Sequence, residues 1–361
     1  MGNYEKWDTE FRNQNLFAFN DAPNGLLWLK VRAVCRGRLL RQFLEKTTIS
    51  LSSTKISEQN RELFHLLEDN PQAMLVLDGF LRDKNHNWYD SQGINEERLK
   101  EDLYKIQNYS WGGDHNNSLD KYLVGRYVKT IGSYDELLCK RDEIAANSWN
   151  YVQTSWYNNW TSYLIEAIFK RHAKVISAIG EIKSVDFFIG NKPFDLKVTY
   201  FPNQYMDEKL KEKLGKREIS WLKAKAKENN IGFDQQLSES QLTYVLSEKF
   251  RERGLNSILE EQAQLRKQVV MQAKENPEEL MQWLYENQGE MRFGAENRIY
   301  LILVDTQDMN QSWKLKRAYS IISPSVTKYL DNFTDEVLKL INFSFQHKSY
   351  QCFSDVIFVL K

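Results

Sequence analysis

The first 170 residues show mostly helical hydrophobic patterns. Apolar positions recur with helical spacing over residues 24–46, where Gly37 could interrupt the helix, and over 57–82 and 95–108. Residues 109–122 are rich in Gly, Asn and Asp and predict a surface loop. A long amphipathic segment follows over 134–172. We therefore expect a mainly helical N-terminal region, assigned to residues 1–147.

The pattern changes at residue 174 to near-alternation with β-branched and aromatic residues, which predicts strands up to about residue 201. Residues 207–293 return to helical spacing, with Pro277 at a first helical position. The short apolar run at 299–306 predicts a buried strand, and the C-terminal run at 350–361 predicts another. The fold class expected is mixed α/β (α+β), with a core over residues 148–361 that carries a helical insertion at about 207–295.

Composition and charge exclude several classes of protein. Among 361 residues, 49 basic and 49 acidic side chains cancel, so no strong basic field indicates a nucleic-acid partner. The three cysteines, Cys35, Cys139 and Cys352, are far apart and fit neither a disulfide framework nor a zinc finger. No uninterrupted apolar stretch reaches the length of a membrane span. We expect a cytoplasmic protein without a membrane segment.

The segment VDFFIGNKPFDLKVT, residues 185–199, predicts a β-hairpin with chemistry on one face. If Gly190 and Asn191 form the turn, opposed residues have numbers that sum to 381, so Asp186 faces Asp195. Ser184 then faces Lys197, which shares a sheet face with Asp195 because side chains alternate along a strand. Phe194, Leu196 and Val198 would point to the opposite, apolar face.

Two opposed carboxylates need a proton or a cation between them, since like charges directly across a sheet destabilise it. Mg²⁺ accepts carboxylate and water oxygens, commonly from one or two protein carboxylates, with substrate phosphate completing its ligands. Asp186 and Asp195 suit this requirement. Lys197 would lie beside a metal-bound water, where it could orient that water and neutralise charge on a phosphoryl oxygen.

These residues resemble the PD-(D/E)XK nuclease superfamily, which includes many type II restriction endonucleases. The likeness consists of an acid, an eight-residue spacer and Asp195-Leu196-Lys197, and it covers residues 160–205, with Val185 where the family often has proline. It implies a mixed sheet flanked by helices, dependence on Mg²⁺ with Mn²⁺ as a substitute, and hydrolysis of phosphodiester bonds. It also implies a further acidic ligand on the preceding helix, where Glu166 stands.

Other interpretations of the same residues stay open. The hairpin acids and lysine could form a surface salt bridge, and Glu166 could be a solvated helical residue. Glu181-Ile-Lys183 and Asp207-Glu208-Lys209 repeat the acid-any-Lys spacing, but neither has an acidic partner at hairpin spacing.

Aromatic and basic clusters have structural interpretations beside functional ones. Trp149, Trp156, Trp160 and Tyr163 form one helical stripe, which we expect to be core and to pack the helix onto the hairpin, although such a stripe could stack on bases. The basic residues between Lys30 and Arg41 could contact phosphates, but a continuous helix would place them on two sides; they are Lys30, Arg32, Arg36, Arg38 and Arg41. The cluster at 209–227 includes acids and is better explained as a solvated helix.

Several alternative chemistries lack their motifs. The five histidines show no HExxH or paired metal spacing, and no phosphate-binding loop, dinucleotide-binding motif or nucleophile elbow is present. The resemblance to the PD-(D/E)XK superfamily implies a Mg²⁺-dependent DNA endonuclease of restriction or phage-defence type, with double-stranded DNA as its partner and no nucleotide cofactor. Because restriction-type members often act as two-fold dimers, the resemblance also implies a homodimer. The alternatives are a non-catalytic nucleic-acid-binding or scaffolding protein on the same fold, a helical interaction protein, or a nuclease that acts on RNA.

Overall fold

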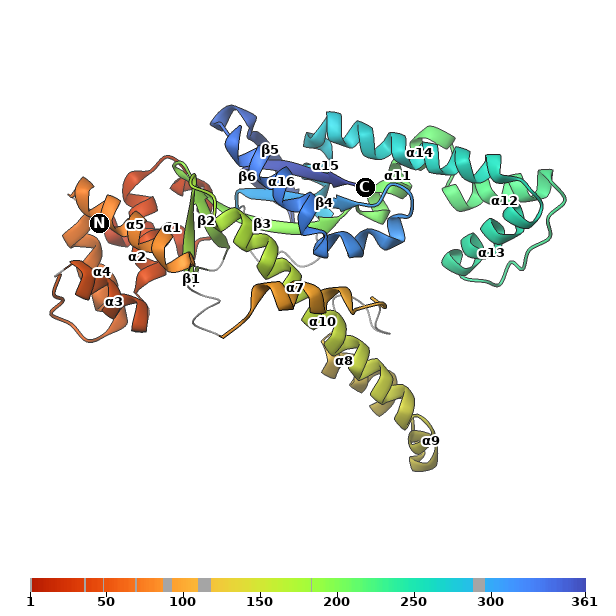
Figure 1. Ribbon diagram of the computed structural model, residues 1–361, viewed down its shortest axis with the longest axis horizontal. Helices are drawn as coiled ribbons and strands as arrows, with labels where there is room; N and C mark the ends of the chain where they lie inside the picture. Colours follow the sequence, from red (N-terminus) through yellow and green to blue (C-terminus); the bar gives the residue numbers. More distant parts are fainter. Residues whose placement is uncertain are drawn as a thin grey trace.

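Figure 1 shows a computed structural model of the chain. It describes residues 2–35, 37–47, 49–68, 70–86, 93–109, 118–182, 184–287 and 296–361. Most of the predicted loop at 109–122 and His115 lie outside these residues. None of the described helices combines the length and apolar character that a membrane span requires.

A mixed sheet forms the centre of the molecule. Its described strands are β1 (Val175–Ile182), β2 (Val185–Ile189), β3 (Lys192–Tyr200), β4 (Arg298–Val304), β5 (Lys339–Phe345) and β6 (Lys348–Leu360). They lie in the order β1-β2-β3-β4-β6-β5, and β4 is parallel to both β3 and β6, whereas the other pairs are antiparallel. Every residue of β4 is buried, as a strand with neighbours on both edges and helices on both faces requires. The predicted mixed α/β class is confirmed.

The N-terminal helices pack on one end of the sheet. They are α1 (Asn3–Arg12), α2 (Pro23–Val34), α3 (Gly37–Thr47), α4 (Ile56–Leu67) and α5 (Pro71–His86). The next helices, α7 (Glu96–Tyr104), α8 (Leu119–Leu123) and α9 (Tyr134–Cys139), instead pack against the long helix that follows them in the chain. Helix α2 ends at Val34 and α3 begins at Gly37, which has φ +43°, so the predicted interruption of the helix is confirmed. Residues of α1 to α5 share one hydrophobic core with Ile176 and Phe188 of β1 and β2. The N-terminal helices therefore pack against strands β1 and β2.

Helix α10 (Arg141–Lys170) crosses the molecule, and only its C-terminal half packs on the sheet (Figure 1). Ile165 and Phe169 share a core with β2 to β4 and β6, and the Phe169 ring stacks on Phe187 with centroids 5.4 Å apart. Helix α16 (Tyr319–Asp331) covers the same sheet face. Because Glu166 lies between the two packed residues, α10 holds it close to the hairpin.

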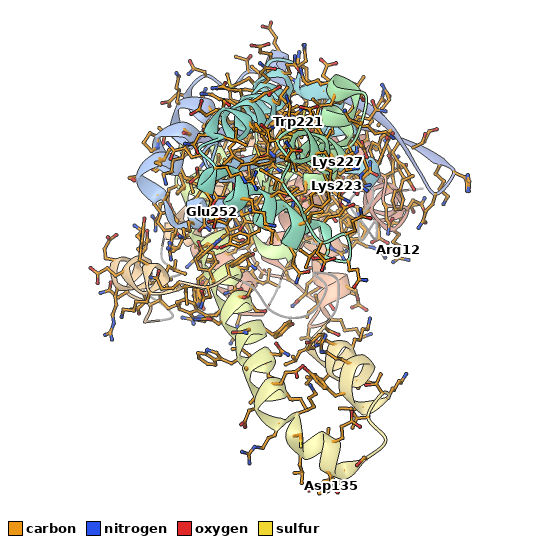
Figure 2. The ribbon with its side chains drawn as sticks, turned by 90° about the vertical axis from the view of Figure 1, so that its right-hand side faces the viewer. Arg12, Asp135, Trp221, Lys223, Lys227 and Glu252 are labelled. Carbon is orange, nitrogen blue, oxygen red and sulfur yellow. The ribbon has the colours of Figure 1, made fainter. Side chains whose placement is uncertain are left out.

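The N-terminal half of α10 projects with α8 and α9 as an arm, and Figure 2 shows Asp135 at its far end. Trp149 is 63% exposed on this arm, so the prediction that it belongs to the core is wrong. Trp156, Trp160 and Tyr163 do pack against buried residues, but against Leu103 and Trp313 rather than the hairpin. The aromatic stripe therefore extends from the packed part of α10 onto the projecting arm, where Trp149 is exposed.

The connection from β3 to β4 is helical, as predicted. It contains α11 (Asn203–Leu214), α12 (Glu218–Glu228), α13 (Glu239–Glu252), α14 (Asn256–Glu275) and α15 (Pro277–Asn287). Parts of α11, α14 and α15 cover the second face of the sheet, while α12 and α13 form a smaller core around Trp221 and Phe250 (Figure 2). Lys209 pairs with Glu279 at 2.6 Å, and Lys225 pairs with Glu261 at 3.4 Å. The basic cluster at 209–227 thus lies on helices α11 and α12, and two of its lysines, Lys209 and Lys225, form ion pairs with acids on neighbouring helices.

Candidate functional site

The β2–β3 hairpin has the predicted register. Phe187 pairs with Phe194 and Ile189 with Lys192, so that the numbers of paired residues sum to 381. Gly190 has φ +56° in the turn, a conformation that glycine adopts without the steric cost other residues carry. Turn chemistry and strand alternation therefore identified this hairpin correctly.

The recorded β2–β3 pairing ends at Phe187–Phe194, and β3 continues with β4 as its neighbour from Asp195 to Tyr200. The backbone N–H of Asp195 donates to the carbonyl of Asn297 at 2.9 Å, while the N–H of Leu196 donates to Asp186 Oδ2 at 2.8 Å. The Asp186 carboxylate thus takes the place of a backbone partner on the β2 side of β3. The predicted opposition of Ser184 and Lys197 is wrong, because Ser184 lies in the β1–β2 turn with φ +77°.

Three acidic residues interact at this edge of β3. Burial, together with the negative charges of Glu166 and Asp195, raises the pKa of Asp186 to about 7. The Leu196 N–H and Lys170 act in the opposite direction. Glu166 itself forms an ion pair with Lys170 one turn along α10. The structure therefore brings the three predicted acids into one electrostatic group, although they come from α10, β2 and β3.

An arginine that the sequence analysis did not identify forms an ion pair with Asp195. Arg298 Nε donates to Asp195 Oδ2 at 2.7 Å, and its Nη2 lies 3.5 Å from Glu296 Oε2. Burial raises the pKa of Glu296 to about 7 despite the opposing positive charge of Arg298. Asp195 and Arg298 are partners in the parallel β3–β4 register. No local pattern indicates this pair, because 103 positions separate the two residues.

Lys197 is exposed and lies near a second lysine that the sequence analysis also missed. Burial, together with the positive charge of Lys197, lowers the pKa of Lys316 to about 8. Lys316 Nζ donates to Asn158 Oδ1 on α10 at 3.0 Å. This lysine belongs to the 3-10 helix η3 (Met309–Arg317), so a positive region follows the acids along β3.

The acidic side chains of this site meet some of the requirements of a hard divalent cation. Asp186 and Asp195 supply carboxylate oxygens, and Mg²⁺ commonly takes one or two such ligands together with water and phosphate oxygens. Within the described ranges, however, no three His, Cys, Asp or Glu residues are grouped so that they could hold one metal ion. Asp186 and Asp195 could hold Mg²⁺, and the role of Glu166 as a further ligand stays a prediction.

The raised pKa of Asp186 predicts a pH-dependent stability. The folded protein keeps this proton up to about pH 7, whereas an unfolded chain releases it near pH 4, so the free energy of unfolding falls as the pH rises between these values. We expect the free energy of unfolding of Asp186→Asn to exceed that of the native chain by roughly 2–4 kcal/mol at pH 8. The two free energies should converge toward pH 4. Urea unfolding in EDTA measures the difference.

The matched control for this experiment is Asp142→Asn, whose side chain is 89% exposed at the start of α10. Its free energy of unfolding should follow that of the native chain at both pH values. If Asp186→Asn is no more stable than the native chain at pH 8, then the charged Asp186 carboxylate does not destabilise the folded protein at that pH, and the prediction is wrong.

Comparison of the chain with family models, with curated proteins and with solved structures gave no match. The interpretation of the site therefore depends on the residues and contacts of this chain.

Proposed function

We propose that the chain is a Mg²⁺-dependent endonuclease that hydrolyses DNA phosphodiester bonds. The observation that carries this proposal is the position of Asp186, half-buried beside Asp195 at the point of β3 where hairpin pairing ends, with Lys197 two residues beyond Asp195 on the same strand. Two carboxylates followed by an exposed lysine suit metal-assisted attack on a phosphate.

Each residue has a defined role in this proposal. Asp186 and Asp195 would hold Mg²⁺, which when bound supplies a more acidic water and neutralises phosphate charge. Lys197 would orient the attacking water and stabilise negative charge on the phosphoryl oxygen. Glu166 would accept a hydrogen bond from metal-bound water, or ligate the metal if the site contracts. Lys316 adds positive charge near Lys197.

The order of elements supports the finer assignment to a PD-(D/E)XK nuclease. A helix that carries an acid, α10, precedes the antiparallel strands β1 to β3, and β4 returns parallel to β3. This is the mixed sheet with flanking helices that the resemblance implies. A restriction or phage-defence role, a duplex DNA substrate, a cytoplasmic location and a homodimer belong to the same proposal, with the N-terminal helices and the insertion contacting the duplex.

The test is incubation of purified protein with unmethylated phage DNA and Mg²⁺, with EDTA as the control. We expect cleavage that requires the metal, because the two carboxylates alone repel the phosphate. Discrete fragments would indicate a restriction enzyme, and a smear would indicate a less selective nuclease. Parallel reactions on duplex RNA distinguish the two polymers, and absence of cleavage of every substrate would contradict the assignment.

One observation favours a second candidate, a non-catalytic nucleic-acid-binding protein on the same fold. The Arg298 guanidinium already neutralises Asp195 and occupies Oδ2, which a metal would need. Calorimetric titration with Mg²⁺ separates the two candidates, because the nuclease requires binding that Asp186→Asn weakens. DNA binding without any detectable Mg²⁺ binding would favour the non-catalytic protein.

A further inference from the structure

A second charged site lies in the N-terminal helices, away from the hairpin acids. A cavity of 690 Å³ is bordered by α1, α2 and the start of α4, the helices at the N-terminal end of the molecule in Figure 1. Three arginines line it, Arg12, Arg32 and Arg61, and Asp8 is the one acid among its lining residues in the described part of the chain. The lining therefore carries an excess of positive charge.

Arg32 is the best-positioned cation of this cavity. Its guanidinium lies over the rings of Phe11 and Trp28, with the central carbon 4.8 Å and 5.1 Å from their centroids. Within the residues that the structure describes, it has no carboxylate partner. Stacking on aromatic rings orients the guanidinium plane and leaves its N–H donors for a ligand. A guanidinium presented in this way matches the fork geometry with which arginine binds phosphate.

The other arginines have partners that a phosphate could replace. Arg12 pairs with Asp8 at 2.7 Å, and Arg61 pairs with Glu5 at 3.0 Å, with side chains 77% and 58% exposed for the two arginines. Exposed ion pairs of this kind contribute little to stability, so they exchange readily for a doubly charged ligand. The arginines can therefore turn toward an anion without disturbing the fold.

The phenol of Tyr4 lies among the same charges. Burial and the carboxylate of Asp8 raise the pKa of Tyr4, whereas Arg32 and Arg61 lower it. Its hydroxyl is thus a neutral donor in a positive surrounding.

The start of α4 completes the lining of the cavity. Ile56 and Ser57, the first residues of this 12-residue helix, border the cavity, and the N-cap residue Lys55 makes no side-chain cap hydrogen bond. The first N–H groups of a helix favour an anion.

The described basic residues between Lys30 and Arg41 lie in different surroundings. Lys30 turns inward and pairs with Asp78 at 2.7 Å, while Arg38 is exposed on α3 and lies outside the cavity. Arg36 lies outside the described residues. The sequence analysis assumed one continuous helix for these residues, but the described ones belong to two helices, because α2 ends at Val34 and α3 begins at Gly37. Among the described members of the run, Arg32 is the one that lines the cavity.

We propose that this cavity binds a phosphate group through Arg32, Arg12 and Arg61. A phosphate of the DNA backbone and a free phosphorylated compound present the same oxygens to the three arginines. The first source would make the cavity part of the surface that grips the duplex, and the second would make it a separate ligand site. The proposal goes beyond cleavage and does not require it.

The experiment measures binding in EDTA, where Mg²⁺-dependent cleavage cannot proceed, with inorganic pyrophosphate as one probe and a 20-base-pair duplex as the other. We expect Arg32→Gln and Arg61→Gln to weaken pyrophosphate binding by roughly tenfold or more, because each removes a charge-assisted hydrogen-bond donor. Asp8→Asn should strengthen binding, since it removes the competing carboxylate. Arg38→Gln is the matched control and should bind like the native chain.

The duplex arm identifies the source of the phosphate. If the cavity grips the DNA backbone, Arg32→Gln and Arg61→Gln also weaken duplex binding and reduce its salt dependence by about one counterion for each arginine. If its ligand is a free phosphorylated compound, the duplex affinity is unchanged while pyrophosphate binding is lost. Arg61→Gln keeps the test valid if Arg32→Gln fails to fold, because Arg61 is largely exposed. Equal binding of both probes by Arg61→Gln and Arg38→Gln would overturn the proposal.

Discussion

Replacing Lys197 by alanine should lower the rate of Mg²⁺-dependent DNA cleavage by roughly 100-fold or more, because an interaction that stabilises charge in the transition state is lost. Lys197 is exposed, so its truncation leaves the core unchanged. The free energy of unfolding and the affinity for DNA in EDTA should stay close to those of the native chain. Initial cleavage rates under saturating Mg²⁺ measure the effect.

The control for this experiment is Lys213→Ala, which removes an exposed lysine from α11. Its cleavage rate should equal that of the native chain, which would show that the loss is specific for the position on β3. Asp195→Asn should abolish cleavage as well, and the amide still accepts a hydrogen bond from Arg298. Cleavage at the native rate by purified Lys197→Ala would refute the assigned role.

The second large effect concerns stability. Phe187 is fully buried, and its ring stacks on Phe169, so it joins β2 to α10 at the position that aims Glu166 toward the site. Phe187→Ala should lower the free energy of unfolding by about 3–5 kcal/mol, because it removes buried apolar contacts and leaves a cavity. Denaturant unfolding measures the loss.

Trp149→Ala is the matched control, since it truncates a larger aromatic side chain that is 63% exposed on the arm. Its free energy of unfolding should change by no more than about 0.5 kcal/mol. A comparable loss in both variants would mean that the arm, and not the α10–hairpin contact, governs unfolding.

The hairpin shows how far local pattern determines the site. Its turn residues and its period-two alternation act over fewer than twenty positions, and the register they predict agrees with the paired residues Phe187–Phe194 and Ile189–Lys192. The face assignment also agrees, because Phe194 is buried in the core beneath α10 while Asp195 takes part in the charged group. Both follow from steric rules that need no distant partner.

The surroundings of the hairpin could not be predicted in this way. The register of β3 with β4 depends on how the whole helical connection between them packs, and that register places Arg298 on Asp195. The same holds for Lys316 beside Lys197, and for the convergence of Arg12, Arg32 and Arg61 from three helices. Strand β5 (Lys339–Phe345) was also missed, although its alternating burial is a local pattern that predicts a strand.

The amino-acid sequence by itself determined the class of the fold, the positions of most helices, the hairpin and the three charged residues on it, because helical periodicity, strand alternation and turn chemistry are properties of neighbouring residues. Only the tertiary structure decided which charges meet those residues, where the hairpin pairing ends, and that Arg32 of the basic run shares a cavity with Arg12 and Arg61. Such contacts join positions that are distant in the chain, and their free energy depends on the packing of every element between them.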